Sequence, residues 1–450
     1  MSAADQVSAG RALRKVLPRR DHAAPPSGDR DAVAILEEQN ATRLPELVPV
    51  RMGRMLQSPF ALYRGSAAVM AGDLARGPAT GPQVVACGDA HIANFGLFAS
   101  PERALLFDLN DFDEAGDAPW EWDVKRLAAS VVIGARDLGM DDSAARDAAV
   151  EAVGSYRLRL ARLVEATALD RFYFQVDADA IAQLARGSDR AEVERTLRKA
   201  RSRTSEKVLR KITVEGAGGE RRIADEPPIL RHIAPPAEGA MERIVAAYLR
   251  TVRSDVAQLL SKFRLVDQAL RVVGVGSVGT RCHILLFLGP ADEPLVLQAK
   301  EAGTSVLESH GGSRWRPPGG ARPRRGREGF RVVSCQRILQ AASDPFLGWV
   351  QHDGRDYYVR QFRDMKGSFE ISGLSPSQFA RYGALCGALL ARAHSQSSAP
   401  GVIAAYLGRS TRFDEAVADW SIAYADLVER DHDALAAAVR AGRVPVETGV

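Results

Sequence analysis

The sequence lacks the features that mark exported proteins, zinc ribbons and membrane proteins. It has four cysteines in 450 residues, they lie far apart, and none forms a C-x-x-C pair, which argues against a zinc ribbon or a disulfide framework. No run of about 18 apolar residues occurs, and residues 1–30 lack the apolar core of a secretion signal. Neither sign of charge is in large excess, because 60 Lys and Arg nearly balance 56 Asp and Glu and the net charge is only +4. We therefore expect a globular, cytoplasmic protein with no membrane partner and no need for nucleic acid.

The most informative stretch is C-G-D-A-H-I-A-N-F, which begins at Cys87. Asp89 is followed two residues later by His91 and five residues later by Asn94. Phosphoryl transfer needs a carboxylate to orient or deprotonate a hydroxyl, and an asparagine to help bind Mg²⁺. The spacing D-x-x-x-x-N resembles the catalytic loop of protein kinases, and the histidine resembles the aminoglycoside phosphotransferase branch. We predict Asp89 and His91 as catalytic residues and Asn94 as a metal ligand.

A second acidic stretch, L-L-F-D-L-N-D-F-D, follows at residues 105–113. Residues 95–99 and 104–109 have the pattern of two short strands joined by the turn S-P-E-R. The second strand brings three carboxylates to one loop, where a cation can be bound. We predict Asp111 as the metal ligand, with Asp108 and Asp113 as further or alternative ligands. Each aspartate alone fits a solvated turn equally well, so the prediction depends on their combination.

A glycine-rich segment, V-G-V-G-S-V-G-T, occupies residues 273–280 and has the G-x-G-x-x-G spacing. The segment that follows is short and apolar like a strand, whereas a dinucleotide-binding fold would need a helix there. Strand, glycine loop and strand is the arrangement of a kinase glycine loop. Glycines allow backbone N–H groups to approach phosphates closely. We predict that Gly274, Gly276, Ser277 and Gly279 bind the phosphates of a nucleotide.

The next strand ends in L-V-L-Q-A-K, which matches the V-A-I-K pattern of kinases. Lys300, about twenty residues after the glycine loop, is therefore predicted to neutralise nucleotide phosphates and to take part in catalysis. A carboxylate partner for this lysine is expected on the following helix. Glu308 and Glu328 are the candidates, and Gln336 is placed to face inward; the sequence does not choose among them.

These motifs predict an α+β protein with a kinase-like two-lobe fold in circularly permuted order, because the catalytic and metal segments precede the glycine loop. Residues 1–30 are expected to be a disordered tail and residues 31–265 a mainly helical lobe with the catalytic loops. Residues 266–365 are expected to form a small antiparallel-sheet lobe for the nucleotide, with a flexible Gly-, Pro- and Arg-rich insert at 310–327. Residues 366–450 are expected to return to the helical lobe. Relocated termini are tolerated when they lie on exposed surfaces.

Several runs resemble a bacterial family known as domain of unknown function 2252. They are S-P-F-A-L-Y-R-G from Ser58, C-G-D-A-H-I-A-N-F-G, F-D-L-N-D-F-D-E, P-W-E-W-D-V-K-R-L-A-A-S and Q-A-K-E-A. The resemblance extends from about residue 40 to about residue 440 and implies no activity by itself. Arg64 lies in the first run, where it would contact a phosphate or the acceptor, or else form a structural salt bridge.

The function expected from these residues is transfer of a phosphoryl group from ATP, with Mg²⁺, to an unknown hydroxyl or amine acceptor. Two alternatives use the same groups. The nucleotide could bind in inverted orientation, so that AMP is transferred. The protein could also bind a nucleotide without catalysis and act as an interaction module.

Overall fold

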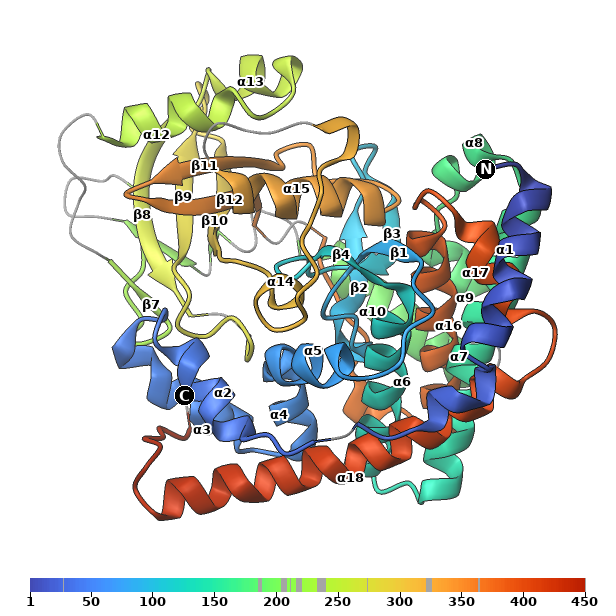
Figure 1. The fold of residues 1–450 in the computed structure, drawn as a ribbon. Helices are drawn as coiled ribbons and strands as arrows, with labels where there is room; N and C mark the ends of the chain where they lie inside the picture. The colour runs from blue at the N-terminus through green and yellow to red at the C-terminus, as the bar shows by residue number, and fades with distance from the viewer. Residues whose placement is uncertain are drawn as a thin grey trace.

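The structure is a computed structural model that describes residues 1–26, 28–184, 188–203, 209–210, 212–215, 221–232, 240–272, 274–320, 326–362 and 365–449. A mainly helical part and a six-stranded antiparallel sheet form the bulk of the molecule (Figure 1). The α+β class predicted from the sequence is therefore confirmed.

The helical part is built from segments near both ends of the chain. Its helices are α1 (Ala3–Val16), α2 (Ala32–Asn40), α3 (Val48–Met55), α4 (Pro59–Gly65), α5 (Ala67–Ala75), α6 (Trp120–Asp137), α7 (Asp142–Glu165), α8 (Ala168–Tyr173), α9 (Ala178–Leu184), α10 (Ser188–Arg201), α16 (Pro376–His394), α17 (Pro400–Leu407) and α18 (Arg412–Arg440). Short strands accompany them: β1 (Gln83–Ala86), β2 (Phe95–Ala99), β3 (Leu105–Leu109) and β4 (Gly116–Pro119). The predicted hairpin is confirmed, because β2 pairs with β3 in antiparallel register.

Small residues allow α7 and α16 to lie close together at the centre of the helical part. A Cβ atom added at Gly387 of α16 would lie 2.1 Å from the carbonyl oxygen of Ala152 in α7. Interiors packed at crystal-like density leave no room for a larger side chain at such a contact. The apolar stripe of α6, which includes Leu127 and Val131, is buried against these two helices. The core that results fixes α6, whose charged residues form part of the candidate site described below.

The six-stranded sheet has the order β11-β12-β10-β9-β8-β7, and every neighbouring pair is antiparallel. Its strands are β7 (Leu230–Arg231), β8 (Arg264–Arg271), β9 (Cys282–Leu288), β10 (Pro294–Ala302), β11 (Gly348–His352) and β12 (Arg355–Gln361). Leu297 and Ala299 of β10 belong to one apolar cluster with residues of α12 (Ala240–Leu249) and α13 (Ser254–Leu260). Because side chains alternate along a strand, Gln298 and Lys300 project from the opposite face.

Helix α15 (Arg327–Leu339) packs against β10, β11 and β12, and the short α14 (Val306–Ser309) precedes it in the chain. A separate pair, β5 (Thr213–Glu215) and β6 (Arg221–Ile223), lies at the β8 side of the large sheet. The predicted boundary at residue 265 comes too late, because β7, α12 and α13 already belong with the sheet. The apolar side of α12, which includes Tyr248, can be buried only against those strands.

The first 26 residues are folded, and the predicted disordered tail is wrong for them. Ser2 and Asp5 form a capping box that starts α1. A Cβ atom at Gly10 would lie 2.2 Å from the carbonyl oxygen of Val402, so α1 is pressed against α17. His22 is fully buried, and its Nε2 lies 2.8 Å from the hydroxyl oxygen of Tyr406. Tertiary packing therefore orders a segment whose sequence shows no obvious periodicity of apolar residues.

The insert at 310–327 also contributes to the core where the structure describes it. Trp315 is buried, and its ring lies 5.7 Å from that of Phe330, centroid to centroid. The backbone N–H of Arg316 donates to Asp117 at 2.8 Å. The expected flexible spacer is therefore wrong for these residues, and 321–325 lie outside the described part of the chain.

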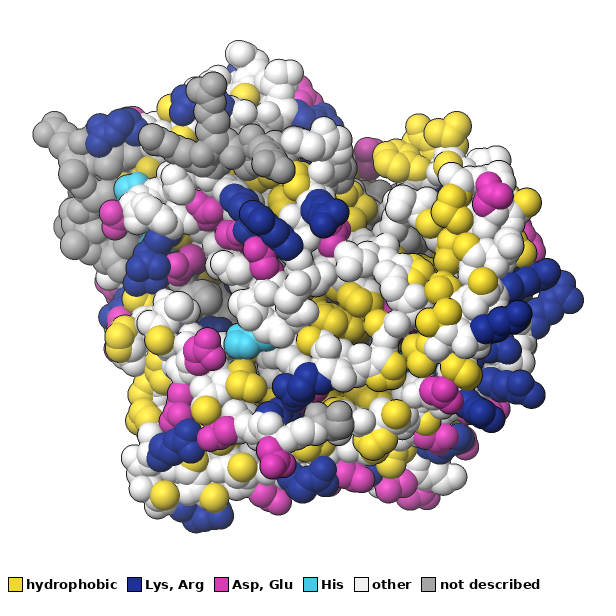
Figure 2. Space-filling view, in the orientation of Figure 1, with side chains coloured by type: hydrophobic (Ala, Val, Ile, Leu, Met, Phe, Trp, Pro, Cys, Tyr) yellow, Lys and Arg dark blue, Asp and Glu magenta, His cyan; other side chains and the backbone are white. Residues whose placement is uncertain are grey.

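The surface carries both signs of charge. Figure 2 shows basic and acidic side chains interspersed over the face drawn, as expected for a net charge of +4. In the portion of the chain that the structure describes, no helix is both long and apolar enough to cross a lipid bilayer.

Candidate functional site

The loop that follows β1 holds Asp89 in a tightly constrained backbone. Gly88 has a φ of 77°, and a Cβ atom there would lie 2.2 Å from the carbonyl oxygen of Glu114. This left-handed conformation favours glycine, and the contact leaves no room for a Cβ atom. His91 caps the short 3-10 helix Ile92–Asn94, because its Nδ1 accepts a backbone N–H of that helix at 3.2 Å. The C-G-D-A-H-I-A-N run thus forms one rigid turn.

Asp89 is held by one of its two carboxylate oxygens. Arg126 of α6 donates to Oδ1 from Nε at 2.9 Å and from Nη2 at 2.7 Å. Burial raises the pKa of Asp89 above its ordinary value, although Arg126 opposes the shift. The second oxygen, Oδ2, lies 3.8 Å from Nε2 of His91. Asp89 therefore keeps one oxygen for a ligand.

His91 is a neutral imidazole in this setting. Burial, with the nearby positive charges of Arg126 and Arg64, lowers its pKa well below the ordinary value. Because Nδ1 accepts a hydrogen bond, the ring proton is assigned to Nε2, on the side of Asp89. The predicted His91 therefore lies beside Asp89, where it orients the loop and the carboxylate.

The predicted metal ligands Asn94 and Asp111 lie next to this turn. The side-chain nitrogen of Asn94 donates to the carbonyl oxygen of Asp89 at 2.7 Å, which leaves the amide oxygen for a cation. Oδ1 of Asp111 and Oδ1 of Asp113 are buried and accept no hydrogen bond from any described residue. Buried oxygens without donors are costly unless a cation or ligand pairs with them. These atoms therefore fit a divalent cation.

A cation here would need ligands beyond protein carboxylates. Across the described ranges, no group of three or more His, Cys, Asp and Glu side chains is arranged to hold a metal ion. Asparagine, water and phosphate oxygens are the usual additional ligands of Mg²⁺. The arrangement thus resembles sites in which the nucleotide completes the coordination.

Lys300 connects the sheet to the acidic loop. Its Nζ makes an ion pair with Asp113 and lies 3.7 Å from Oδ1 of Asp111. Burial alone would lower the pKa of Lys300, but the two carboxylates outweigh it and raise the pKa well above the ordinary value. The pKa of Asp111 is raised by burial and by repulsion from Asp113. Three residues predicted separately from two remote motifs are therefore brought together.

The structure corrects the predicted partner of this lysine. Glu308 pairs with Arg327 at 2.8 Å, and Glu328 pairs with Arg331 at 2.7 Å. Neither glutamate is described in contact with Lys300, so the cofactor-binding role predicted for Glu308 does not fit. The sequence pattern suggested a partner on the next helix, whereas the acidic loop itself provides it.

Asp108 also differs from its prediction as an alternative metal ligand. Its Oδ1 accepts the backbone N–H of Leu109 and its Oδ2 that of Ala341, both at 2.9 Å. The side chain is almost fully buried. Asp108 therefore fastens the end of β3 to the segment after α15 and does not face the acidic loop.

The glycine-rich loop joins β8 to β9, as predicted, although Val273 lies outside the described residues. Gly274 has a φ of 65° and Gly279 a φ of 88°, which are left-handed conformations that favour glycine. A Cβ atom at Gly279 would lie 3.0 Å from the Cβ of Arg43. Gly279 therefore makes room for Arg43 and does not line the cavity, whereas Gly274, Gly276 and Ser277 do.

Segments from the start of the chain hold this loop in place. The backbone N–H of Leu44 donates to the carbonyl oxygen of Gly279 at 2.8 Å. Arg54 of α3 donates to the carbonyl oxygen of Gly274. Val272 and Val278 pack in one apolar cluster with Val50. The loop is thus docked on α3 and its preceding turn, so it is not a free flap.

One cavity of about 500 Å³ is lined by many of the predicted groups, although Lys300 is not among its lining residues. Its lining includes Asp89, His91, Asn94, Asp111, Asp113, Gly274, Gly276, Ser277 and Arg64. The catalytic-loop residues, the acidic loop and the glycine loop therefore face the same space, although they lie up to about 190 residues apart in sequence.

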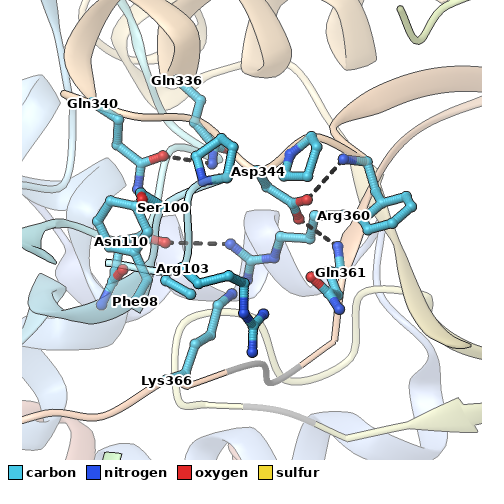
Figure 3. A pocket seen from close by; sticks show the side chains of 14 residues that line it. Phe98, Ser100, Arg103, Asn110, Gln336, Gln340, Asp344, Arg360, Gln361 and Lys366 are labelled. Atoms are coloured by element: carbon cyan, nitrogen blue, oxygen red, sulfur yellow. Dashed lines mark hydrogen bonds between the residues drawn. The ribbon is translucent and has the colours of Figure 1, made fainter. Parts of the chain in front are cut away.

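A second cavity of about 220 Å³ is lined by Asn110 and Arg360 but by none of the predicted catalytic residues (Figure 3). Arg360 donates to the carbonyl oxygen of Asn110 at 3.3 Å. Asp344 accepts backbone N–H groups with both oxygens, as the dashed lines in the figure show. Gln336, which was expected to face inward beside Lys300, lines this second cavity. Its Oε1 is buried and has no described partner.

A buried network behind the turn at Asp89 was missed from the sequence. Asp123 of α6 accepts the backbone N–H groups of Cys87 at 2.6 Å and Gly88 at 2.9 Å. It also lies 3.1 Å from Nε2 of His394, whose Nδ1 is 2.9 Å from the hydroxyl of Tyr156. Charged residues inside the otherwise apolar α6 were the available signal, because a buried charge must be paired.

Glu114 gives the site a dependence on pH that can be measured. Burial raises its pKa from 4.5 to about 7, although its Oε2 accepts the backbone N–H of Val306 at 2.7 Å. The folded state therefore binds the proton more tightly than the unfolded state. The resulting stabilisation is complete below about pH 4.5 and is lost as the pH rises through 7.

We expect Glu114→Gln to remove this loss, because the amide keeps the bond to Val306 and never ionises. Between pH 5 and pH 8 the wild-type free energy of unfolding should fall by about 1–2 kcal/mol more than that of the variant, given the partial exposure of the group. Urea unfolding at several pH values measures the difference. Parallel pH profiles for the two proteins would contradict the assignment.

The residues of the candidate site lie within a segment that matches a known protein family. The profile of a bacterial family, described as an uncharacterized protein conserved in bacteria (DUF2252), matches residues 43–438. The chain belongs to this family. The match includes the turn at Asp89, the acidic loop and Lys300, and it excludes most of the N-terminal segment that packs on α17. Searches of curated proteins and of solved structures gave no match. Membership of the DUF2252 family thus shows common descent but indicates no activity, so any activity has to be inferred from the geometry of the site.

Proposed function

We propose that this DUF2252 protein is an ATP- and Mg²⁺-dependent phosphotransferase with a kinase-like fold in circularly permuted order. One observation carries the proposal: Lys300 of the sheet reaches Asp111 and Asp113 of the helical part, and these two carboxylates line one cavity with Asp89 and the glycine loop. A carboxylate pair and a lone aspartate around one cavity, with a lysine bound to the pair, are groups that phosphoryl transfer requires.

The order of elements in the sheet supports the kinase-like interpretation. The glycine loop joins β8 to β9, the lysine lies on β10, and a helix, α15, comes before β11 and β12. Kinases likewise have a glycine loop, a lysine on the third strand and then a helix. The departure is that no carboxylate of α15 is described in contact with Lys300.

The permutation has support where α16 ends. In a kinase-like chain, one helix leads directly into the catalytic loop. The corresponding helix here would be α16, which comes near the end of the sequence, long after the loop at Asp89. The backbone N–H of Val85 in β1 donates to the hydroxyl of Ser397, just beyond α16, at 3.0 Å. The end of α16 and the strand before Asp89 are therefore neighbours in space, as an unpermuted chain would require.

The proposed chemistry assigns a role to each group. The acceptor hydroxyl approaches Oδ2 of Asp89, which receives its proton as the oxygen bonds to the terminal phosphorus. The bond from that phosphorus to the bridging oxygen breaks, and ADP leaves. Asn94 and Asp111 would hold Mg²⁺, which neutralises charge on the phosphates. Lys300 and the backbone of Gly274 and Gly276 would position the same phosphates.

The proposal is tested by ligand-dependent stability. Mg²⁺ with ATP at 100 times its dissociation constant should raise the free energy of unfolding of the wild-type protein by about 2.7 kcal/mol. ATP with a chelator should have much less effect. Asp111→Asn should lose the magnesium-dependent part, whereas Asp433→Asn, on the exposed side of α18, should keep it.

Turnover separates the candidate reactions. Mass spectrometry of acceptors incubated with Mg²⁺ and ATP should show addition of a phosphate, whereas addition of AMP would indicate the inverted nucleotide. Tight binding with ATP left intact would indicate a non-catalytic module. No magnesium-dependent stabilisation of the wild-type protein would refute nucleotide binding altogether.

A further inference from the structure

Arg64 lines the 500 Å³ cavity, and the described residues offer its side chain no hydrogen-bond or ion-pair partner. It lies in the last turn of α4, whose start is fixed by Ser58, the N-cap residue that accepts the N–H of Ala61 at 3.2 Å. Its Nε is buried, and the side chain makes no hydrogen bond or ion pair with any residue that the structure describes. Arg126, on the other side of Asp89, is by contrast fully engaged.

A partly buried guanidinium without partners is a costly arrangement. Burial lowers the pKa of Arg64 below its ordinary value, and only the charge of Asp89 opposes that effect. Guanidinium groups present a planar fork of donors that binds phosphate or carboxylate with two hydrogen bonds. An oxyanion in the cavity would satisfy these donors, which the described protein groups do not.

Arg64 differs from Arg43 and Lys300 in having donors left for a ligand near Asp89. Lys300 pairs with Asp113 of the acidic loop, and Nη1 of Arg43 donates to the carbonyl oxygen of Val278 in the glycine loop, so the protein already engages both cations. The charge that acts on Arg64 is that of Asp89. The backbone of Arg64 lies against the glycine loop, because a Cβ atom at Gly276 would be 3.3 Å from the carbonyl oxygen of Arg64. Arg64 therefore stands between the glycine loop and Asp89.

We infer that the acceptor carries an oxyanion, a phosphate or carboxylate group, that Arg64 binds beside Asp89. This inference rests on the proposed phosphotransferase function and deepens it. The substrate is then a small anionic molecule that holds a free hydroxyl or amine near its negative group. Neutral sugars and unmodified cationic amines are disfavoured as acceptors, because neither would neutralise Arg64.

The test is calorimetric titration of inorganic phosphate into the protein saturated with Mg²⁺ and a non-hydrolysable ATP analogue. We expect phosphate to bind wild-type protein under these conditions and to bind Arg64→Gln at least tenfold more weakly. Arg64→Lys should be intermediate, because it keeps the charge but loses the fork. Arg20→Gln, at an arginine whose side chain is 85% exposed, should match the wild type.

The dissociation constant of the ATP analogue shows whether the oxyanion that Arg64 binds belongs to the acceptor or to the nucleotide. The acceptor site predicts that Arg64→Gln changes nucleotide affinity by less than twofold, and that phosphate does not compete with the analogue. Competition, together with a tenfold loss of nucleotide affinity in Arg64→Gln, would assign Arg64 to the nucleotide and overturn the inference. Equal phosphate affinity of wild type and Arg64→Gln would also overturn it.

Failure of the proposed function has a different signature. The analogue would then not bind wild-type protein, with or without phosphate, although phosphate binding that depends on Arg64 would persist. That result would leave an anion site but remove the acceptor assignment. Unfolding of each variant without ligand is the folding control, and Arg64→Gln should be at least as stable as wild type because it removes an unpaired charge.

Discussion

Replacing Asp123 with alanine is expected to lower the free energy of unfolding by about 3–5 kcal/mol, the largest effect of any single change at the site. The carboxylate is almost fully buried and accepts the backbone N–H groups of Cys87 and Gly88. It also faces the buried ring of His394. Alanine would leave all these donors without an acceptor in a dry interior. Urea unfolding followed by circular dichroism measures the loss.

Two further variants distinguish this network from a general effect of charge removal. Asp123→Asn keeps one acceptor oxygen and should lose about half as much stability as the alanine variant. Asp142→Ala, at an exposed position at the start of α7, should change stability by less than about 0.5 kcal/mol. A loss below about 1 kcal/mol for Asp123→Ala would show that Asp123 does not hold the catalytic turn.

Lys300→Met is expected to lower the free energy of unfolding by about 2–4 kcal/mol and to abolish stabilisation by Mg²⁺ and ATP. The variant leaves Asp111 and Asp113 as neighbouring carboxylates without their ammonium group. The loss stays below that of a fully buried pair, because these side chains are 35% and 24% exposed and keep part of their hydration. Unfolding with and without Mg²⁺ and ATP measures both effects.

The double variant Lys300→Met with Asp113→Asn is the matched control. It removes one of the two like charges, so it should recover a large part of the stability lost in the single variant but none of the nucleotide response. Because the two residues are in contact, their effects should be strongly non-additive. Additive losses would indicate that the ion pair between Lys300 and Asp113 contributes nothing in solution.

Local signals explain what the sequence alone predicted. The hairpin of β2 and β3, the turn at Asp89 and the strand that ends near Lys300 all have strong short-range patterns, and the structure contains each of them. The spacing of Asp89, Asn94 and Asp111 was enough to place them at one site. Lys300 was added by its distance from the glycine loop, which local geometry largely fixes.

Long-range packing explains what the sequence did not predict. Glu308 and Glu328 were the candidate partners of Lys300 because they follow it in the chain, yet Asp113, 187 residues away, forms the ion pair. Asp108 was grouped with the other aspartates by proximity in sequence, although the alternation of a strand turns it toward Ala341. The folding of residues 1–26 depends on contacts with α17, which no local pattern reveals.

The charged residues of α6 are the most instructive omission. Asp123 and Arg126 bind the turn at Asp89 from a helix that was predicted only for its apolar stripe. Their positions within a mostly apolar helix could have marked them as buried and therefore paired. Their partners could not have been inferred, because those partners depend on where β1 meets α6.

The separation of Asp113 from Lys300 has a consequence for biosynthesis. Ribosomes add about 5–20 residues per second, so about 10–40 s pass between the appearance of the aspartate and that of the lysine, 187 residues later. Throughout that interval the nascent polypeptide holds an acidic loop without its ammonium counter-charge. The helices α16 and α18 that complete the core emerge later still. The acidic loop is therefore synthesised long before the lysine and the helices that complete its surroundings.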